Sequence, residues 1–226
     1  MSEFFHLVLA GNIGAGKTTV TGLLSERFGW RAYYERVAEN PFLEPFYGNM
    51  ERWAFALQIY FLTHRLGDHR AIEERRESAI QDRSIHEDAL IFARNLHEMG
   101  MMGDGEWESY LALYRQVVAL LRPPDLVVYL RRDVDSLCRN IHLRGRDYEA
   151  SMPRDYLKRL NRYYEDWIAS RGHERVLLVE SDDLDFVDRP ADLELLVRQV
   201  QSAMGQRELF AADDAPPDLR FRLLAP

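Results

Sequence analysis

Residues 11–19 combine the residue types that bind phosphate groups. Gly11, Gly14 and Gly16 lead directly into Lys17 and Thr18, which gives the pattern G-x-x-x-x-G-K-T. Glycines let backbone N–H groups turn inward around phosphate oxygens, and a following helix N-terminus adds positive partial charge. The lysine can bridge the outer phosphates of a nucleotide, and the threonine hydroxyl can hold Mg²⁺. The stretch therefore predicts a P-loop for ATP, made of Gly11, Asn12, Ile13, Gly14, Ala15, Gly16, Lys17, Thr18 and Thr19.

Three acidic or basic residues follow other predicted strands. Glu35 ends a strand predicted over residues 32–35, and Asp82 and Arg83 end one predicted over 78–82. Beside a P-loop, a glutamate can accept the proton of an attacking hydroxyl, and an aspartate can support Mg²⁺. The arginine can neutralise charge on a transferred group. The alternatives are a solvated glutamate and an ordinary surface Asp–Arg pair.

Two further groups of polar residues can contact ligands. Arg144 and Arg146 flank Gly145, which indicates a lid that closes over ATP, although cations also suit an ordinary helix C-terminus. Polar residues also occur among apolar neighbours, and there the carboxamide of a glutamine would suit the edge of adenine or cytosine. From the residues alone, the favoured reading is an ordinary polar surface; the residues are Tyr47, Gln58, Arg65 and Asp88.

The surrounding segments predict an α/β fold that positions these residues. Strands are predicted over residues 5–9, 32–35, 78–82, 125–131 and 176–180, and helical periodicity separates them. Such alternation predicts a parallel sheet with helices on both faces and ligands beyond the carboxyl ends of the strands. After the P-loop, Val20, Leu23, Leu24 and Phe28 fall at helical spacing, and further helices are predicted over about residues 52–77, 86–99, 107–121, 134–143, 154–170 and 190–204.

Length and composition limit the remaining possibilities. The chain has 226 residues, so we expect one domain over 1–205, with a lid near 144–153 and a peripheral C-terminal tail over 206–226. The net charge of −8 argues against nonspecific binding of nucleic acid. No segment has the length and apolarity of a membrane span or the pattern of a signal peptide. The single cysteine, Cys138, fits a reducing cytoplasm.

Four further motifs make the chain resemble the deoxynucleoside kinase family, and most closely its bacterial deoxyadenosine and deoxyguanosine kinases. They are ENPFLEPFY at 39–47, ERWAFALQIYFL at 51–62, QDRSIHED at 81–88 and LRGR at 143–146. The resemblance covers roughly residues 5–187. It implies a three-layer P-loop kinase fold with a five-stranded parallel sheet and a helical lid. It also implies ATP as donor, Mg²⁺ and a homodimer.

The same resemblance implies a role for each matching residue. Glu35 corresponds to the general base toward the sugar 5′-hydroxyl, with Arg83 near the 5′-oxygen and phosphates and Lys17 on the donor. Asp82 replaces a glutamate that animal members place beside Mg²⁺, and Arg36 replaces their proline. The remaining roles are contacts of Tyr47 and Glu149 to the 3′-hydroxyl, of Gln58, Arg65, Asp88 and Phe92 to the base, and of Arg144 and Arg146 to the donor.

The resulting hypothesis is ATP-dependent 5′-phosphorylation of a purine deoxynucleoside. Deoxyadenosine ranks first, deoxyguanosine second and deoxycytidine third. Thymidine ranks last, because the Arg65–Asp88 pair should crowd its methyl group. A nucleoside-monophosphate kinase would share the P-loop and lid, but Glu35 would repel the phosphate of its acceptor. A non-enzymatic ATP-dependent switch is the third reading, and it would form no phosphorylated product.

Overall fold

A six-stranded sheet organises the chain. The computed structural model describes residues 4–37, 39–146, 149, 152–170, 175–205, 218 and 220–224. Within this part, the strand order is β2-β3-β1-β4-β5-β6, with β1 to β5 parallel and β6 antiparallel to β5. The strands are β1 (His6–Ala10), β2 (Arg31–Tyr33), β3 (Ala79–Asp82), β4 (Leu126–Arg131), β5 (Val176–Glu180) and β6 (Phe221–Leu224).

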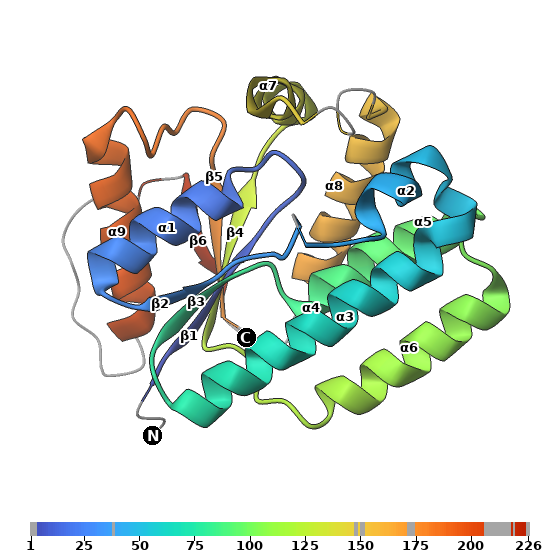
Figure 1. Ribbon diagram of the computed structural model, residues 1–226. Coiled ribbons are helices and arrows are strands. Elements are labelled where there is room, and N and C mark those ends of the chain that lie inside the picture. The colour runs from blue at the N-terminus through green and yellow to red at the C-terminus, as the bar shows by residue number, and fades with distance from the viewer. Residues whose placement is uncertain are drawn as a thin grey trace.

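Helices connect the parallel strands and cover both faces of the sheet. They are α1 (Lys17–Phe28), α2 (Leu43–Gly48), α3 (Met50–Arg75), α4 (Ile85–Glu87), the π-helix η1 (Asp88–Ala93), α5 (Arg94–Glu98), α6 (Asp104–Val118), α7 (Val134–Arg144), α8 (Arg154–Ala169) and α9 (Pro190–Gly205). Figure 1 shows α1 and α9 on one side of the sheet and α3 and α8 on the other, with α6 outermost.

Successive side chains of a strand point to opposite faces of the sheet, so the buried strands contribute to one apolar cluster on each face. Leu7 and Leu9 of β1 pack in a cluster with side chains of α1 and α9, whereas Val8 and Ala10 pack with α8. All five residues of β1 are buried, as the apolar run predicts for a central parallel strand. A third apolar cluster joins α2, α3, α5 and α6 into a helical layer beside the α8 face.

The predicted α/β fold is confirmed, with three corrections. All five predicted parallel strands are present, but β6 adds a sixth strand from the segment that we assigned to a peripheral tail. Phe221 is buried against β5 and α9, which explains why this short segment joins the sheet. The strand predicted over 32–35 ends at Tyr33, so Glu35 lies in the following loop. The short helix α2 was not predicted.

Some expectations concern residues outside the described part. The predicted lid includes residues 147, 148, 150 and 151, and the predicted tail includes residues 206–217, 219, 225 and 226, all of which lie outside the described residues. Among the described residues, no helix has both the length and the apolarity that a bilayer crossing requires.

Candidate active site

The sheet register brings the P-loop next to the end of β3. Leu9 of β1 lies opposite Asp82 of β3, and the backbone N–H of Arg83 donates to the Leu9 carbonyl at 2.9 Å. The P-loop follows β1 directly, so Asp82 and Arg83 lie beside it at the carboxyl edge of the sheet. This is the edge at which open parallel sheets bind their ligands.

Glycines shape the P-loop where the chain passes close to other backbone. Gly14 has a φ of +82°, and a Cβ atom there would lie 2.7 Å from the carbonyl oxygen of Leu137 in α7. Gly11 has a φ of +152°, and its Cβ would lie 2.9 Å from the carbonyl oxygen of Leu130. Both contacts are too short for any side chain, so these glycines permit the loop to pack against β4 and α7.

Lys17 at the start of α1 is folded back onto its own loop. Its Nζ donates to the carbonyl oxygens of Gly11 at 2.8 Å and Asn12 at 2.9 Å. Burial lowers the pKa of Lys17 to about 8, and the nearby Arg83 charge adds to this effect against the opposing carboxylate of Asp82. The ammonium group is therefore poorly compensated and prepared to accept an anionic ligand.

A hydroxyl and a carboxylate meet where a metal ion would bind. Thr18 Oγ1 donates to Asp82 Oδ2 at 2.6 Å, which brings together the two residues predicted to support Mg²⁺. The described residues contain no cluster of three or more His, Cys, Asp or Glu side chains suited to a metal. One carboxylate and one hydroxyl still fit Mg²⁺, because this ion takes few protein ligands and completes its shell with water and substrate phosphates.

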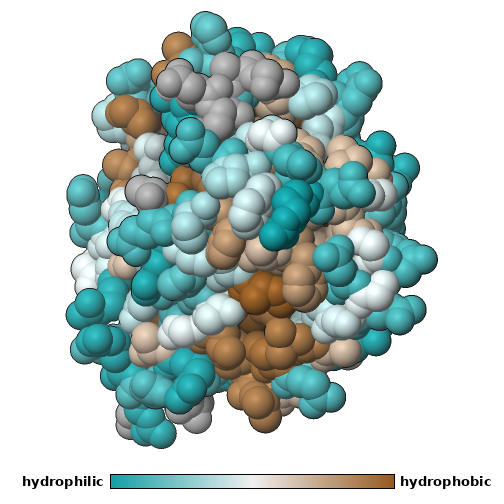
Figure 2. Space-filling model, turned by 45° about the vertical axis from the view of Figure 1, so that its right-hand side comes forward, coloured by the Kyte–Doolittle hydropathy of each residue, from teal (hydrophilic) through white to brown (hydrophobic). Residues whose placement is uncertain are grey.

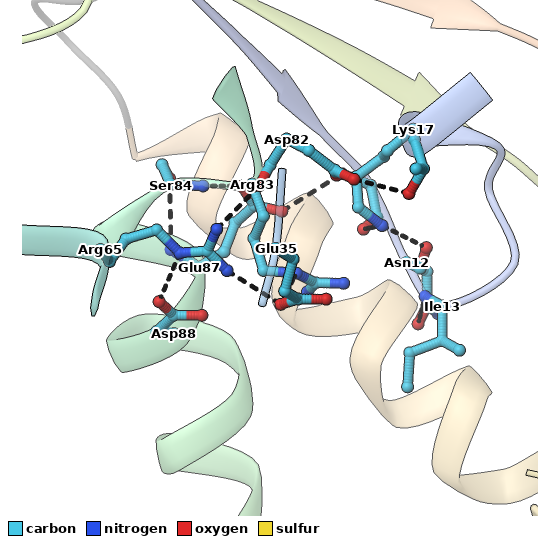
Figure 3. A network of polar contacts seen from close by, with 12 residues as sticks. Asn12, Ile13, Lys17, Glu35, Arg65, Asp82, Arg83, Ser84, Glu87 and Asp88 are labelled. Carbon is cyan, nitrogen blue, oxygen red and sulfur yellow. Dashed lines mark hydrogen bonds and ion pairs between the residues drawn. The ribbon is translucent and has the colours of Figure 1, made fainter. Parts of the chain in front are cut away.

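Arg65 of α3 holds two carboxylates together. Its Nη2 contacts Glu35 Oε1 at 2.8 Å, and its Nε contacts Asp88 Oδ2 of η1 at 3.0 Å. A third bond runs from Nη1 to the carbonyl oxygen of Asp82 at 2.8 Å. Figure 3 shows the Arg65 guanidinium between Asp88 and Glu35. Since only 3% of its side chain is exposed, Arg65 is a buried anchor rather than a surface charge.

Glu35 is held in its ionised form by cations. Arg83 Nε lies 3.1 Å from Glu35 Oε1, the oxygen that also contacts Arg65. Burial opposes ionisation, but the charges of Arg83, Arg65 and Lys17 outweigh it and hold the pKa of the Glu35 carboxyl below its ordinary value. The side chain remains 22% exposed, so a ligand can still reach the carboxylate.

Arg83 is fixed in an unusual backbone conformation. Its φ of +72° lies in the left-handed region, which few residues other than glycine adopt. The guanidinium carbon lies 4.2 Å from the ring centroid of Phe92, and Nη1 donates to the Tyr164 hydroxyl at 3.2 Å. Strained residues persist where surrounding contacts determine them, and such strain is common at functional sites.

Two cavities meet at the P-loop. A cavity of about 140 Å³ lies between Glu35, α2, α3 and η1, and a larger open cleft of about 1040 Å³ lies between the P-loop, α7 and residues 182–189. They share Gly14, Lys17, Thr18, Arg144 and Arg146. The smaller cavity is further lined by nine predicted residues, which are Ile13, Glu35, Tyr47, Gln58, Asp82, Arg83, Asp88, Phe92 and Glu149.

Gln58 has a free hydrogen-bonding group at the smaller cavity. The side chain is buried, and its Oε1 has no hydrogen-bond partner among the described residues. A buried, unsatisfied carboxamide oxygen is costly unless a ligand completes it. Across the cavity, Glu149 is buried and paired with Arg144 and, at 3.3 Å, with Arg146, so the described lid residues hold one another.

The family follows from a comparison with known proteins. A family model described as deoxynucleoside kinase matches residues 7–204. The chain belongs to this family. It is therefore a deoxynucleoside kinase, a phosphotransferase that uses a nucleotide as phosphate donor.

Curated relatives of this kinase are named for different bases. This chain is 35% identical over 200 residues to the deoxyadenosine/deoxycytidine kinase of Bacillus subtilis, and the match covers 88% of this chain and 92% of that protein. It is 36% identical over 203 residues to a deoxyguanosine kinase of Lactobacillus acidophilus, covering 86% and 88%. The deoxyadenosine kinase of the same species is 36% identical over 191 residues, covering 80% and 87%.

Solved structures agree on the fold of this deoxynucleoside kinase. The deoxyadenosine kinase of M. mycoides with bound dATP superposes with a TM-score of 0.74 at 27% identity, covering 87% of this chain and 99% of that one. The same enzyme with the products dCMP and a flexible dCDP gives a TM-score of 0.77, covering 88% and 100%.

Several residues that line the kinase site have no motif in the sequence. Tyr156 of α8 lines the smaller cavity, while Arg132, Arg139, residues 182–187 and Arg189 line the larger cleft. Glu87 and Tyr164 are buried, contact each other and line neither cavity. Conversely, Asn12 lines neither cavity, because its side chain bonds to the carbonyl oxygen of Leu157 at 3.0 Å and to Asn161 at 2.7 Å.

Proposed function

We propose that this deoxynucleoside kinase transfers the terminal phosphoryl group of ATP to the 5′-hydroxyl of a purine deoxynucleoside, with deoxyadenosine preferred. The observation that carries the proposal is the meeting of the two cavities at Lys17 and Thr18. The larger cleft suits the donor, and the smaller one, which Glu35 and Gln58 line, suits the acceptor. Phosphoryl transfer needs this arrangement because attacking and leaving oxygens lie roughly in line on the phosphorus.

Glu35 acts in this proposal as the general base. Because Arg83, Arg65 and Lys17 keep its carboxylate ionised, it can accept a hydrogen bond and then the proton from the 5′-hydroxyl. Lys17 and Arg83 face the transferred group, and Arg144 and Arg146 reach the donor from the lid. When bound, Mg²⁺ held by Thr18 and Asp82 would neutralise charge on the donor phosphates.

The preference for adenine rests on Gln58 and on the relatives. A carboxamide can pair with the donor and acceptor edge of adenine or cytosine, and Oε1 of Gln58 is buried without a partner in the described part of the chain. The B. subtilis and M. mycoides proteins carry deoxyadenosine in their names. A deoxyguanosine kinase is equally similar to this chain, so deoxyguanosine and then deoxycytidine are the alternatives.

Phosphorylation assays with all four deoxynucleosides and with dAMP test the proposal. We expect ADP and dAMP in equal amounts from ATP and deoxyadenosine, with a lower kcat/KM for the other three acceptors. A preference for dAMP as acceptor would instead indicate a monophosphate kinase, and ATP turnover without phosphorylated product would indicate a switch. Either result contradicts the proposal.

The Glu35→Gln variant tests the mechanism. It removes the base while retaining size and shape, so we expect kcat to fall by about 10²–10⁴ while the thermal unfolding midpoint changes little. Glu26→Gln, at an exposed position on α1, is the matched control and should retain the wild-type rate. A Glu35→Gln enzyme within about three-fold of the wild-type kcat would remove Glu35 from the reaction.

We also propose that this cytoplasmic enzyme is a homodimer whose interface lies on the helical layer. Figure 2 shows apolar side chains gathered on the face that this layer presents. On and just beyond α6, Leu113 is 45% exposed and Leu120 is 83% exposed. A second copy would cover such side chains. Sedimentation at micromolar concentration should give a dimer, and a Leu113→Glu/Leu120→Glu variant should be monomeric; a monomeric wild type would contradict the proposal.

A further inference from the structure

A buried hydroxyl on α8 connects the P-loop with Arg83. Tyr164 is completely buried, and its hydroxyl oxygen lies 2.6 Å from the carbonyl oxygen of Gly11, 2.7 Å from Glu87 Oε1 and 3.2 Å from Arg83 Nη1. Its ring stacks on Tyr129 with centroids 5.5 Å apart. The hydroxyl therefore contacts two segments that are far apart in the sequence, the P-loop at Gly11 and the segment that holds Arg83 and Glu87, while the ring is held separately by packing.

Glu87 holds the backbone of the same two segments. It is completely buried, and its Oε2 accepts a bond from the N–H of Ser84 at 2.7 Å, immediately after Arg83. Its Oε1 accepts a longer bond from the N–H of Gly11 at 3.3 Å. Figure 3 shows Glu87 and Ser84 close to Arg83. The Ser84 bond anchors the turn in which Arg83 adopts its left-handed conformation.

The Tyr164 hydroxyl makes two short contacts with acceptor oxygens but can donate only one hydrogen bond. A phenol carries one proton, so it cannot donate to both the Gly11 carbonyl and Glu87 Oε1. Burial raises the pKa of the Glu87 carboxyl, against the opposing charges of Arg83 and Lys17. A protonated Glu87 would donate to the phenol oxygen, which would leave the phenol proton for the Gly11 carbonyl.

Binding of the donor would remove one of the two hydrogen-bond partners that contact the Gly11 carbonyl oxygen. Lys17 Nζ and the Tyr164 hydroxyl both contact that oxygen, at 2.8 Å and 2.6 Å. To reach the donor phosphates, Lys17 must leave the carbonyl oxygens of the loop. Tyr164 does not face the donor cleft, so its bond to Gly11 can persist and prevent a buried carbonyl from losing every partner.

We propose that Glu87 and Tyr164 form a positioning pair, which holds the first peptide of the P-loop and the Arg83 guanidinium in the arrangement that phosphoryl transfer requires. The inference rests on the proposed kinase reaction. Neither side chain touches a substrate in this proposal; both act through Gly11, Ser84 and Arg83. Loss of the hydroxyl should therefore reduce kcat while leaving the binding of the acceptor nearly unchanged.

A pair of adjacent tyrosines provides the variant and its control. Tyr164→Phe removes the hydroxyl and keeps the stacked ring. Tyr163→Phe removes a hydroxyl from the next residue of α8, which instead bonds to Glu98. We expect Tyr164→Phe to lower kcat by about ten- to a hundred-fold, with KM for deoxyadenosine within about three-fold of wild type. Tyr163→Phe should keep kcat within about two-fold. Both should unfold at similar temperatures.

Amide hydrogen exchange supplies a readout that does not depend on catalysis. Without nucleotide, the peptide that contains residues 11–17 should exchange at least about five-fold faster in Tyr164→Phe than in the wild type or in Tyr163→Phe. Unchanged exchange in Tyr164→Phe, a kcat within about two-fold of wild type, or an equal loss in both variants would overturn the pairing. A wild-type enzyme that phosphorylates no deoxynucleoside would refute the proposed function, while the exchange rates would still decide the role of the pair.

Discussion

The affinity for ATP should fall as the pH rises above about 8, because the proposed donor site binds phosphates through a charged Lys17. Burial lowers the pKa of this ammonium group to about 8 in the free enzyme, from an ordinary value of 10.5. Donor phosphates stabilise the charged form and raise the pKa again, so binding at alkaline pH must take up a proton. The terminal phosphate of ATP has already lost its last proton above about pH 7.5, which isolates the lysine as the changing group.

The size of this effect follows from the pKa. With a value of about 8, roughly three quarters of the enzyme carries a charged Lys17 at about pH 7.5, and about one tenth does so at about pH 9. The dissociation constant should therefore rise about eight-fold between these two values. Isothermal titration calorimetry with ATP, without acceptor, measures it directly. Repeating each titration in two buffers that differ in ionisation enthalpy counts the proton taken up.

A variant with a permanent charge supplies the control. In Lys17→Arg the guanidinium stays protonated throughout this range, so its weaker binding of ATP should not depend on pH. The reasoning would be refuted by a wild-type dissociation constant that changes less than about two-fold, or by an equal slope in both proteins.

Three further predictions concern stability, the loop and the metal. His6 is buried with a pKa of about 3 instead of 6.5, so below pH 6.5 the unfolded chain binds a proton that the folded chain refuses. As the pH falls below 6.5, this group should lower the free energy of unfolding by up to about 1.4 kcal/mol per pH unit. In His6→Asn, the free energy of unfolding measured by urea titration should therefore change less steeply with pH than in the wild type. Gly14→Ala forces a Cβ to 2.7 Å from a carbonyl oxygen, so its ATP affinity should fall more than about ten-fold, whereas Gly105→Ala, with open space around it, should bind normally. Thr18→Val removes the hydroxyl beside Asp82, so the Mg²⁺ concentration at half-maximal rate should rise by about ten-fold or more; an unchanged requirement would contradict the site.

Much of the fold was predictable because its signals are local. Strands β1, β4 and β5 are mostly apolar runs, and the P-loop motif fixes both the end of β1 and the start of α1. The short elements lacked such signals. Helix α2 has six residues and contains Pro45, and β6 has four residues that follow a long aperiodic segment. Their positions depend on packing against α3 and β5, which no local pattern reveals.

Site residues with a local sequence signal were likewise predictable, whereas those defined by contacts between distant parts of the chain were not. Glu35, Asp82 and Arg83 were predictable because residues that follow parallel strands gather at one edge of the sheet. Glu87 does have a local signal, since Ser84 and Glu87 form a capping box at the start of α4. That pattern predicts a helix start. It does not predict a carboxyl buried against Tyr164, 77 residues further along the chain.

The proposed base and its two arginines form one electrostatic unit. Arg83 and Arg65 favour the Glu35 carboxylate, which keeps it ready at neutral pH but also makes it a weaker base. When Glu35 takes the proton of the acceptor hydroxyl, it becomes neutral, and its two partners respond differently. Arg65 keeps its ion pair with Asp88, whereas Arg83 loses its 3.1 Å partner and presents a less compensated charge to the cavity. Proton transfer to Glu35 would thus increase the positive field on the phosphoryl group at the moment when negative charge spreads over its oxygens.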